Sequence, residues 1–163
     1  MIIVTGSAGF IGSCLVSELN HLGYYNLILV DDFSNQNKNK NLKNSKFYKK
    51  IDRGNFIDWF KNNYKDITFL FHLGARTDTS ELDIEIFKYL NLNYSKALYK
   101  ICVKSKIPFV YASSAATYGM GEFGFDDNHE KISSLLPLNP YAAYKNKFDK
   151  WILSNVDKPS SFV

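Results

Sequence analysis

Short apolar runs alternate with helical stretches along this chain. The runs at residues 2–4, 67–71 and 107–112 are bounded by polar residues and do not alternate between apolar and polar positions. Runs of this kind are typical of strands that are buried on both faces of a parallel sheet. Because helical stretches separate them, the pattern predicts an α/β domain with a doubly wound parallel sheet, the Rossmann fold.

The same pattern predicts where the elements lie. We expect strands at residues 2–5, 26–31, near 47–51, 67–72 and 107–113, and helices at 10–22, within 55–63, within 83–104 and at 141–155. The segments 33–46 and 114–140 are expected to be loops. We find no internal repeat and no linker, so residues 1–163 should form one domain without a second. The last helix should close around 157–159, and a further apolar run begins at 161–163. We therefore expect the domain to be incomplete at its C-terminus, inside a strand.

The composition is that of an ordinary globular protein. Of 163 residues, 45% are hydrophobic and 22% are charged, and no apolar run reaches the length of a membrane span. The chain begins with a core strand, without the basic segment of a secretory signal. Cys14 and Cys102 lie in predicted helices without a CxxC spacing, which favours reduced cysteines that serve packing. We expect a cytoplasmic protein that does not bind membranes.

The net charge of +4 is concentrated in one segment. Six lysines and no acidic residue lie between residues 32 and 52, at positions 38, 40, 43, 46, 49 and 50. Such a cluster could form a nucleic-acid patch. The segment is also rich in asparagine, holds no arginine before position 53 and has only Phe47 and Tyr48 as aromatic residues among the lysines. We therefore favour a solvated loop, with one or two lysines that bind phosphate, and expect no nucleic-acid partner.

Residues 2–12 combine an apolar strand, a glycine-rich turn and the start of a helix. Gly6, Gly9 and Gly12 follow the strand in the manner of a dinucleotide-binding turn. Gly6 permits a sharp turn, Gly9 lets a pyrophosphate approach the backbone, and Gly12 lets the helix pack closely on the strand. The helix N-terminus then offers N–H groups to the phosphates. A plain strand–turn–helix connection is the alternative, but Asp31 and Asp32 end the next apolar run, where a carboxylate contacts the adenosine ribose.

A second group of residues has the chemistry of an acid/base catalyst. Tyr141 and Lys145 lie four residues apart in a predicted helix, which places their side chains on one face, roughly 5–6 Å apart at Cβ. The pKa of a free tyrosine is about 10, and a nearby ammonium group lowers it. Such pairs are common on helix surfaces, but Ser113 and Ser114 follow a strand at the end of the sheet where ligands bind. We predict that Tyr141 exchanges a proton with an alcohol and that a serine hydroxyl holds the reacting oxygen.

The histidines and one acidic segment carry weaker signals. His72 ends a predicted strand, where a structural role with a backbone hydrogen bond is favoured over catalysis. His21 and His129 have no metal-ligand spacing with each other or with a cysteine, so no metal site is predicted. The acidic cluster at 126–130 is interpreted as a solvated lid with a smaller chance of contact to a sugar.

These motifs together resemble the extended short-chain dehydrogenases/reductases. The stretches that carry the resemblance are MIIVTGSAGFIGS, FHLGARTDTSE, NYSKALYKIC, IPFVYASSAATYG and LNPYAAYKNKFDKW, which cover most of residues 1–155. Within that group the likeness is strongest to the ADP-L-glycero-D-manno-heptose 6-epimerases, which make a lipopolysaccharide precursor. The resemblance implies a nucleotide-sugar substrate and a tightly held NADP, with NAD as the alternative. In such enzymes hydride leaves C6 of the sugar and returns to the other face of the ketone.

Carried over position by position, the resemblance implies a role for each part of the site. Besides the glycine turn, Phe10 and Ile11 are expected against the pyrophosphate. The adenosine ribose and any 2′-phosphate should be surrounded by Asp31, Asp32, Lys38 and Arg53. The nicotinamide side should be lined by Leu73, Gly74, Ala75, Arg76, Thr77 and Asn91. The catalytic group should be Ser114, Tyr141 and Lys145, of which the last two also contact the cofactor.

The sequence departs from the family pattern at two places and lacks one part of it. Ser7 stands where a glycine is common, and Tyr144 replaces the serine usual before the lysine; we expect no catalytic consequence from either. The second acid/base of the family, a lysine, and the sugar-binding domain would follow residue 163. We therefore expect the 163-residue chain alone to be inactive, and the full-length form to be a homo-oligomer.

Two other functions remain open at this stage. A nucleotide-sugar dehydratase needs a further acid/base pair to expel water. Dehydratases of this family carry Asp-Glu after the serine or threonine, where this chain has Ala115 and Ala116. A non-catalytic, redox-sensing module would usually lose the Tyr–Lys pair, which is intact here. Both observations favour the epimerase.

Overall fold

The computed structural model describes residues 1–154 and 161–162. These residues form two compact units. Unit 1 contains residues 1–74, 100–111 and 161–162, and unit 2 contains residues 75–99 and 112–154. The expected closure of the last helix at 157–159 and the end of the last strand at residue 163 lie outside the described residues. Among the helices that are described, none is long and apolar enough to span a membrane.

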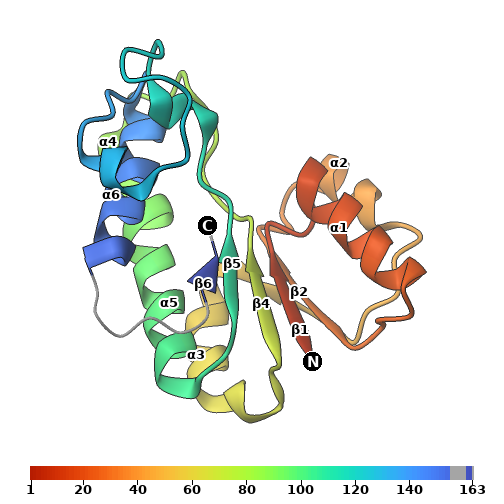
Figure 1. The fold of residues 1–163 in the computed structure, drawn as a ribbon. Coiled ribbons are helices and arrows are strands. Elements are labelled where there is room, and N and C mark those ends of the chain that lie inside the picture. The colour runs from red at the N-terminus through yellow and green to blue at the C-terminus, as the bar shows by residue number, and fades with distance from the viewer. Residues whose placement is uncertain (155–160, 163) are drawn as a thin grey trace. The chain divides into compact units, whose positions relative to one another are not determined.

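Unit 1 is built on a six-stranded parallel sheet (Figure 1). The strands are β1 (Ile2–Thr5), β2 (Leu27–Asp31), β3 (Lys49–Asp52), β4 (Phe69–His72), β5 (Phe109–Tyr111) and β6 (Ser161–Phe162). Their order is β3-β2-β1-β4-β5-β6, so the direction of winding reverses at β1. This is the strand order of the Rossmann fold, and it confirms the predicted fold class.

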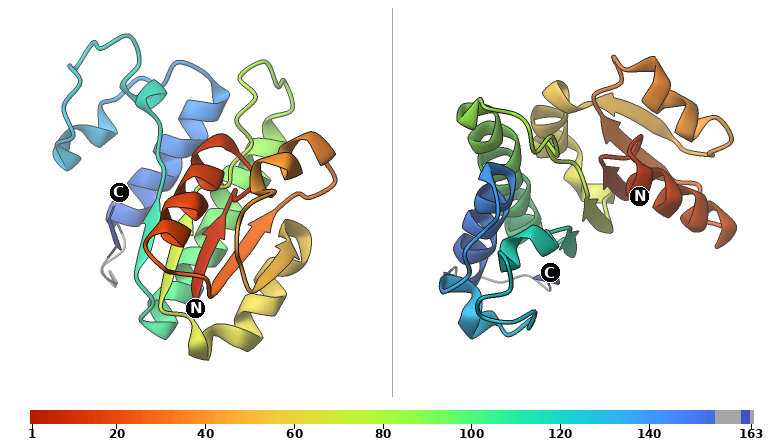
Figure 2. Two further views of the ribbon diagram at one scale, coloured as in Figure 1. Left: turned by 90° about the vertical axis from the view of Figure 1, so that its right-hand side faces the viewer. Right: turned by 90° about the horizontal axis from the view of Figure 1, so that it is seen from above.

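The central strands are buried on both faces, as their unbroken apolar runs predict. Helices α1 (Phe10–His21) and α3 (Arg53–Asn63) cover opposite faces of the sheet (Figures 1 and 2). Val4 and Leu29 belong to the core cluster that includes Val16 of α1. Because side chains alternate along a strand, Ile3 and Ile28 point to the other face, and they are fully buried as well.

The segment expected to be a loop at 33–46 contains two short helices, α2 (Gln36–Asn39) and the 3₁₀ helix η1 (Lys40–Leu42). Asn35 caps α2, because its side chain accepts hydrogen bonds from the backbone N–H groups of Asn37 and Lys38. Leu42 is buried and joins the core cluster under α1. The expected loop is therefore wrong as a description of this segment.

The long helix predicted within 83–104 is present without a break, but its winding changes along its length. The helix expected within 83–104 consists of α4 (Ile84–Phe87), the π-helix η3 (Lys88–Asn93) and α5 (Tyr94–Ser105), whose last residues belong to unit 1. Two 3₁₀ helices, η4 (Ala115–Tyr118) and η5 (His129–Ser133), lie in the segment expected to be a loop; a third, η2 (Tyr64–Asp66), follows α3 in unit 1. The last helix is α6 (Pro140–Ser154), which begins at the predicted proline. Aromatic contacts of α6 residues with Phe87 and Tyr99 stabilise the unit.

The two cysteines are free, but they do not share one role. Cys102 is fully buried in α5, as expected for packing, and burial raises the pKa of its thiol to about 12. Cys14 is exposed on α1, so the packing role predicted for it is wrong.

Candidate active site

The glycine turn of unit 1 has the close contacts that its sequence predicts. Gly6 adopts a φ of +70°, and a Cβ atom there would lie 2.6 Å from the backbone nitrogen of Gly74. A Cβ atom on Gly12 would lie 2.0 Å from the carbonyl oxygen of Gly6. Neither position can hold a side chain without displacement of the backbone. The predicted structural roles of both glycines are therefore confirmed.

The first turn of α1 is open to solvent. Gly9 is its N-cap and supplies no side-chain cap, so the first N–H groups keep the bonding capacity that every helix N-terminus has. Phe10 and Ile11 follow directly and are 83% and 63% exposed. The N–H groups of this turn suit a bound pyrophosphate, and the exposed side chains of Phe10 and Ile11 lie beside them. Contact of these residues with a cofactor stays a prediction.

Asp31 fastens the glycine turn to the end of β2. Its carboxylate is 6% exposed and accepts hydrogen bonds at both oxygens. Oδ2 accepts from the N–H of Ala8 at 2.8 Å, and Oδ1 accepts from the N–H of Asp32 at 2.8 Å and from Lys38 Nζ at 2.9 Å. Asn41 donates to the carbonyl of Ala8 at 2.9 Å and strengthens the same junction. Asp31 thus has a structural role that sequence reasoning did not assign, besides its predicted contact with ribose.

Asp32 and Arg53 present opposite charges at the carboxyl ends of β2 and β3. Their side chains are 44% and 38% exposed, and Arg53 donates to Asp32 Oδ2 at 3.3 Å. The pKa of Asp32 is lowered, chiefly by the hydrogen bonds from the hydroxyl and N–H of Ser34 and then by the charge of Arg53. An ionised carboxylate beside a guanidinium can serve a ribose hydroxyl and a phosphate respectively.

His72 has a structural role. Its ring is fully buried, with Nδ1 2.7 Å from the hydroxyl oxygen of Thr5. The same hydroxyl accepts the N–H of Gly74 at 3.2 Å, and the carbonyl of Thr5 accepts the N–H of Leu73 at 3.2 Å. These contacts place Leu73 and Gly74 at the end of β4. The structural role expected for His72 is confirmed, and the Thr5 hydroxyl is one of its partners.

Asn91 in unit 2 shapes the loop that the resemblance assigns to the nicotinamide side. The side chain is fully buried in η3, accepts the N–H of Arg76 at 2.8 Å and donates to its carbonyl at 2.9 Å. The guanidinium of Arg76 pairs with Asp78 at 3.1 Å and with Glu81 at 2.8 Å. Asn91 therefore fixes the backbone between Ala75 and Thr77. Contact of this loop with nicotinamide stays a prediction.

The predicted catalytic residues lie together in unit 2. The hydroxyl of Ser114 interacts with the phenol of Tyr141 and lowers its pKa, and it also accepts the N–H of Ala116 at 3.2 Å as the N-cap of η4. Lys145 is 2% exposed, and its Nζ donates to the carbonyl of Ala112 at 2.7 Å. Helix α6 thus brings the phenol of Tyr141 and a buried ammonium to the residues that follow β5.

The pKa of Tyr141 shifts in the direction opposite to the one the Tyr–Lys spacing predicted. Burial raises the pKa of Tyr141, the hydrogen bond from Ser114 opposes this shift, and the charge of Asp149 adds to it. Burial also lowers the pKa of Lys145 to about 8, against the attraction of Asp149. The reason is that both groups lose solvation, and the ammonium is directed to Ala112.

Asp149 is the residue that sequence reasoning missed. It is 3% exposed, and its Oδ2 accepts a hydrogen bond from the hydroxyl of Ser113 at 2.5 Å. The available signal was its spacing, because it follows Lys145 by four residues and so continues the face that carries Tyr141.

The acidic segment 126–130 is exposed, as expected of a solvated lid. Asp126 pairs with Lys131 at 2.7 Å, Asp127 accepts a hydrogen bond from the hydroxyl of Tyr118, and Asn128 caps η5. These contacts organise the segment by itself, and its contact with a sugar stays a prediction.

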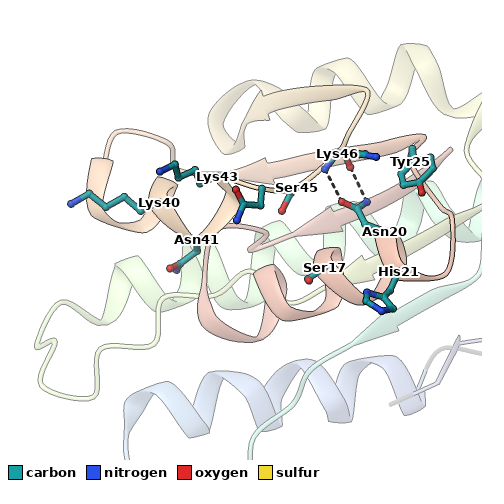
Figure 3. A pocket seen from close by; sticks show the side chains of 10 residues that line it. Ser17, Asn20, His21, Tyr25, Lys40, Asn41, Lys43, Ser45 and Lys46 are labelled. Carbon is teal, nitrogen blue, oxygen red and sulfur yellow. Dashed lines mark hydrogen bonds between the residues drawn. The ribbon is translucent and has the colours of Figure 1, made fainter.

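A pocket of about 430 Å³ lies in unit 1, beside α1 (Figure 3). Asn20 closes one side of it, since its side chain bonds both backbone groups of Lys46. Lys40 donates to Asn37, and Lys46 lies over the ring of Tyr25. None of the predicted site residues lines it. The lining residues are Ser17, Asn20, His21, Tyr25, Lys40, Asn41, Lys43, Asn44, Ser45 and Lys46. The pocket does not change the assignment of the site.

Known proteins resemble this chain over nearly its whole length. A protein named ADP-L-glycero-D-manno-heptose-6-epimerase from Fusobacterium nucleatum is 39% identical over 99% of the chain, and one of the same name from Brachyspira hyodysenteriae is 44% identical over 93%. The chain spans 50% and 48% of these relatives, about half their length. The crystal structure of the Helicobacter pylori protein of that name superposes with a TM-score of 0.79 at 28% identity, over 94% of this chain and 50% of the other.

The match to a family model covers residues 2–160, which include the glycine turn, the serine pair and the Tyr–Lys pair. Such coverage together with the sequence identity of the relatives decides the assignment. The chain belongs to the NAD dependent epimerase/dehydratase family.

Proposed function

We propose that this chain carries the cofactor-binding and acid/base residues of an ADP-L-glycero-D-manno-heptose-6-epimerase. The observation that carries the proposal is the group on α6 and after β5, in which Ser114 interacts with Tyr141 and Lys145 is buried one helical turn away. The names of the relatives support the heptose substrate. A sugar alcohol placed at this group would meet a phenol and a serine hydroxyl together.

The residues of unit 1 fit a dinucleotide. The glycine turn leaves no room for side chains at Gly6 and Gly12 and leaves the N–H groups of α1 open. We propose NADP as the cofactor, because Lys38 and Arg53 bring two cations to the ends of β2 and β3. Asp31 is weaker evidence for NAD than its sequence position indicates, because its oxygens already accept hydrogen bonds from Ala8, Asp32 and Lys38.

In the proposed reaction the bound cofactor supplies hydride acceptance and hydride return. Tyr141 takes the proton of the sugar hydroxyl as the alcohol is oxidised, and gives it back to the ketone oxygen in the reverse step. Ser114 holds the same oxygen by its hydroxyl. A raised pKa keeps Tyr141 protonated at neutral pH, which suits the step in which it acts as an acid. Lys145 supplies the nearby positive charge that favours the phenolate in the other step.

A dehydratase is the less favoured alternative. The residues that follow Ser114 are Ala115 and Ala116, at the start of η4, and neither can donate or accept a proton. Expulsion of water would need such a group close to the reacting sugar.

The experiment that tests the function is a substrate comparison in the full-length protein. Purified enzyme is incubated with each of the two ADP-heptose epimers and, in parallel, with UDP-glucose. We expect interconversion of the ADP-heptoses and no comparable change of UDP-glucose. Conversion of UDP-glucose alone would refute the heptose substrate but keep the epimerase, whereas dehydrated products would refute epimerisation itself.

A further inference from the structure

Helix α6 contacts three consecutive residues of the segment that follows β5. Tyr141, Lys145 and Asp149 lie on one face of the helix at a spacing of four residues. Tyr141 meets the hydroxyl of Ser114, Lys145 donates to the carbonyl of Ala112 at 2.7 Å, and Asp149 accepts from Ser113 at 2.5 Å. Three turns of one helix thus bind the segment 112–114.

Asp149 is an unusual residue to bury. Asp149 is only 3% exposed. Burial of a carboxylate is costly unless hydrogen bonds and an opposite charge compensate for its lost solvation. The hydroxyl of Ser113 supplies a short, charge-assisted hydrogen bond. The ammonium of Lys145 supplies an opposite charge, which is itself 2% exposed.

We propose that Asp149 is a positioning residue for the proposed epimerase reaction, which holds Ser113 so that Ala112 and Ser114 stay in contact with Lys145 and Tyr141. The inference rests on the proposed function, because Tyr141 and Ser114 are the groups that would touch the sugar. Rotation of the Ser113 backbone would move the neighbours on both sides, so the bond of Asp149 to Ser113 at the centre helps to fix both contacts.

The charge of Asp149 has a second effect in the same place. Burial alone favours neutral Lys145, and the field of Asp149 opposes this by raising the pKa of Lys145. Without that carboxylate the pKa of Lys145 would fall below about 8, towards the working pH. Asp149 therefore keeps Lys145 charged to higher pH, while the same charge raises the pKa of Tyr141.

Other charges near α6 belong to elements that pack on it, and most of them have partners of their own. Lys88 of η3 pairs with Glu85 of α4 at 3.0 Å, and Tyr118 of η4 donates to Asp127. In η5, Lys131 pairs with Asp126 at 2.7 Å, and His129 and Glu130 are exposed. Lys96 of α5 lies over the ring of Trp151, 4.9 Å from its centroid. The carboxylate that acts on Lys145 is Asp149.

The test compares kcat as a function of pH in the full-length enzyme and three variants. Asp149→Asn removes the charge and keeps the shape, Ser113→Ala removes the hydrogen bond and keeps the charge, and Asp149→Glu restores the charge. We expect Asp149→Asn to lower kcat about 10- to 100-fold and to move the alkaline loss of activity to lower pH by roughly one unit or more. Ser113→Ala should lower kcat without moving that limb, and Asp149→Glu should return the limb towards wild type. Asp58→Asn, at an exposed carboxylate of α3, is the charge control.

A readout without turnover separates this proposal from the proposed function. Because the folded pKa of Lys145 lies below that of about 10.4 in an unfolded chain, the unfolded state binds more protons, and Lys145 adds stability as pH rises from about 8. The measurement is the free energy of unfolding as a function of pH, and subtraction of the curve measured for Lys145→Met removes the contribution of other groups such as Cys102. In Asp149→Asn the rise of this free energy should begin at lower pH, even if the enzyme acts on another sugar.

Specific outcomes would overturn the proposal. One is an Asp149→Asn enzyme with kcat within a factor of two of wild type and an unmoved alkaline limb. If Asp149→Asn does not fold, wild-type kcat in Ser113→Ala overturns the proposal equally, because the hydrogen bond would then position nothing.

Discussion

At the scale of single residues, Asp31 and Lys38 each have a structural role in unit 1 besides the contact with the cofactor that the sequence predicts. Their ion pair of 2.9 Å ties the α2 segment to the end of β2, and Asp31 also holds the N–H of Ala8 in the glycine turn. Lys38 is 41% exposed, so its ammonium can still reach a phosphate on the solvent side. Its contribution to cofactor choice and its contribution to the turn can be measured separately.

Lys38→Ala should weaken NADP much more than NAD. The reason is that an ammonium group at a 2′-phosphate makes a charge-assisted hydrogen bond, worth about 1.5–3 kcal/mol, which NAD cannot form. We expect a loss of NADP affinity of roughly tenfold or more. Competition binding of both cofactors to the full-length protein measures it. Lys43→Ala is the matched control, since Lys43 belongs to the same segment but lines the pocket beside α1.

Equal weakening of both cofactors by Lys38→Ala would contradict the phosphate role. That result would mean that Lys38 acts through Asp31 and the glycine turn, to which NAD and NADP bind alike.

Residue-scale chemistry was predictable where spacing alone decides it. The Tyr141–Lys145 pair and the clash at Gly12 follow from helix and turn geometry. The direction of the Tyr141 pKa did not follow, because it depends on burial and on Asp149, which tertiary structure brings together. Asp31 likewise shows its bond to Ala8 only when β1 and β2 are paired.

At the scale of elements, the apolar runs predicted every strand of the sheet to within a few residues. The helix predicted within 83–104 is present as an unbroken helical run over 84–105, but residues 88–93 of it form a π-helix, which buries Asn91 against the backbone of Arg76. Apolar periodicity carries no information on such a local change of winding. The short helix α2 was missed for a related reason, since one cap at Asn35 and one buried Leu42 support it.

Helix α3 offers a test of how the elements are stabilised. Asp52 is its N-cap and accepts the N–H of Gly54 at 2.8 Å, where a negative charge also suits the helix dipole. Asp52→Ala should lower the free energy of unfolding by about 1 kcal/mol in urea denaturation.

Asp58→Ala is the control on the same helix. Asp58 is 84% exposed and pairs with Lys61 only at the surface, so its loss should cost about 0–0.5 kcal/mol. Equal effects of the two substitutions would show that the cap contributes no more than a surface charge.

At the scale of the whole molecule, the chain is a family member in which the predicted functions divide between two units. Unit 1 holds the sheet, the glycine turn and the charged residues at the strand ends, and unit 2 holds the serine pair and α6. The relatives are about twice as long as this chain, so activity should be measured on the full-length protein.

The central claim is that Tyr141 is the acid/base of an epimerase, and one substitution pair tests it most directly. Tyr141→Phe and Tyr144→Phe each remove one hydroxyl from α6. Tyr144 is 8% exposed and stacks on Phe87 with ring centroids 6.4 Å apart. It is therefore a tyrosine of the same helix that serves packing, which makes it the matched control. The measurement is the rate at which each full-length variant interconverts the two ADP-heptose epimers, together with its NADP affinity.

Tyr141→Phe should slow interconversion by roughly 10²–10⁴-fold while NADP affinity stays nearly unchanged. Tyr144→Phe should retain a rate close to that of wild type. If Tyr141→Phe interconverts the epimers within a factor of a few of wild type, Tyr141 does not carry the proton and the account of the site is wrong.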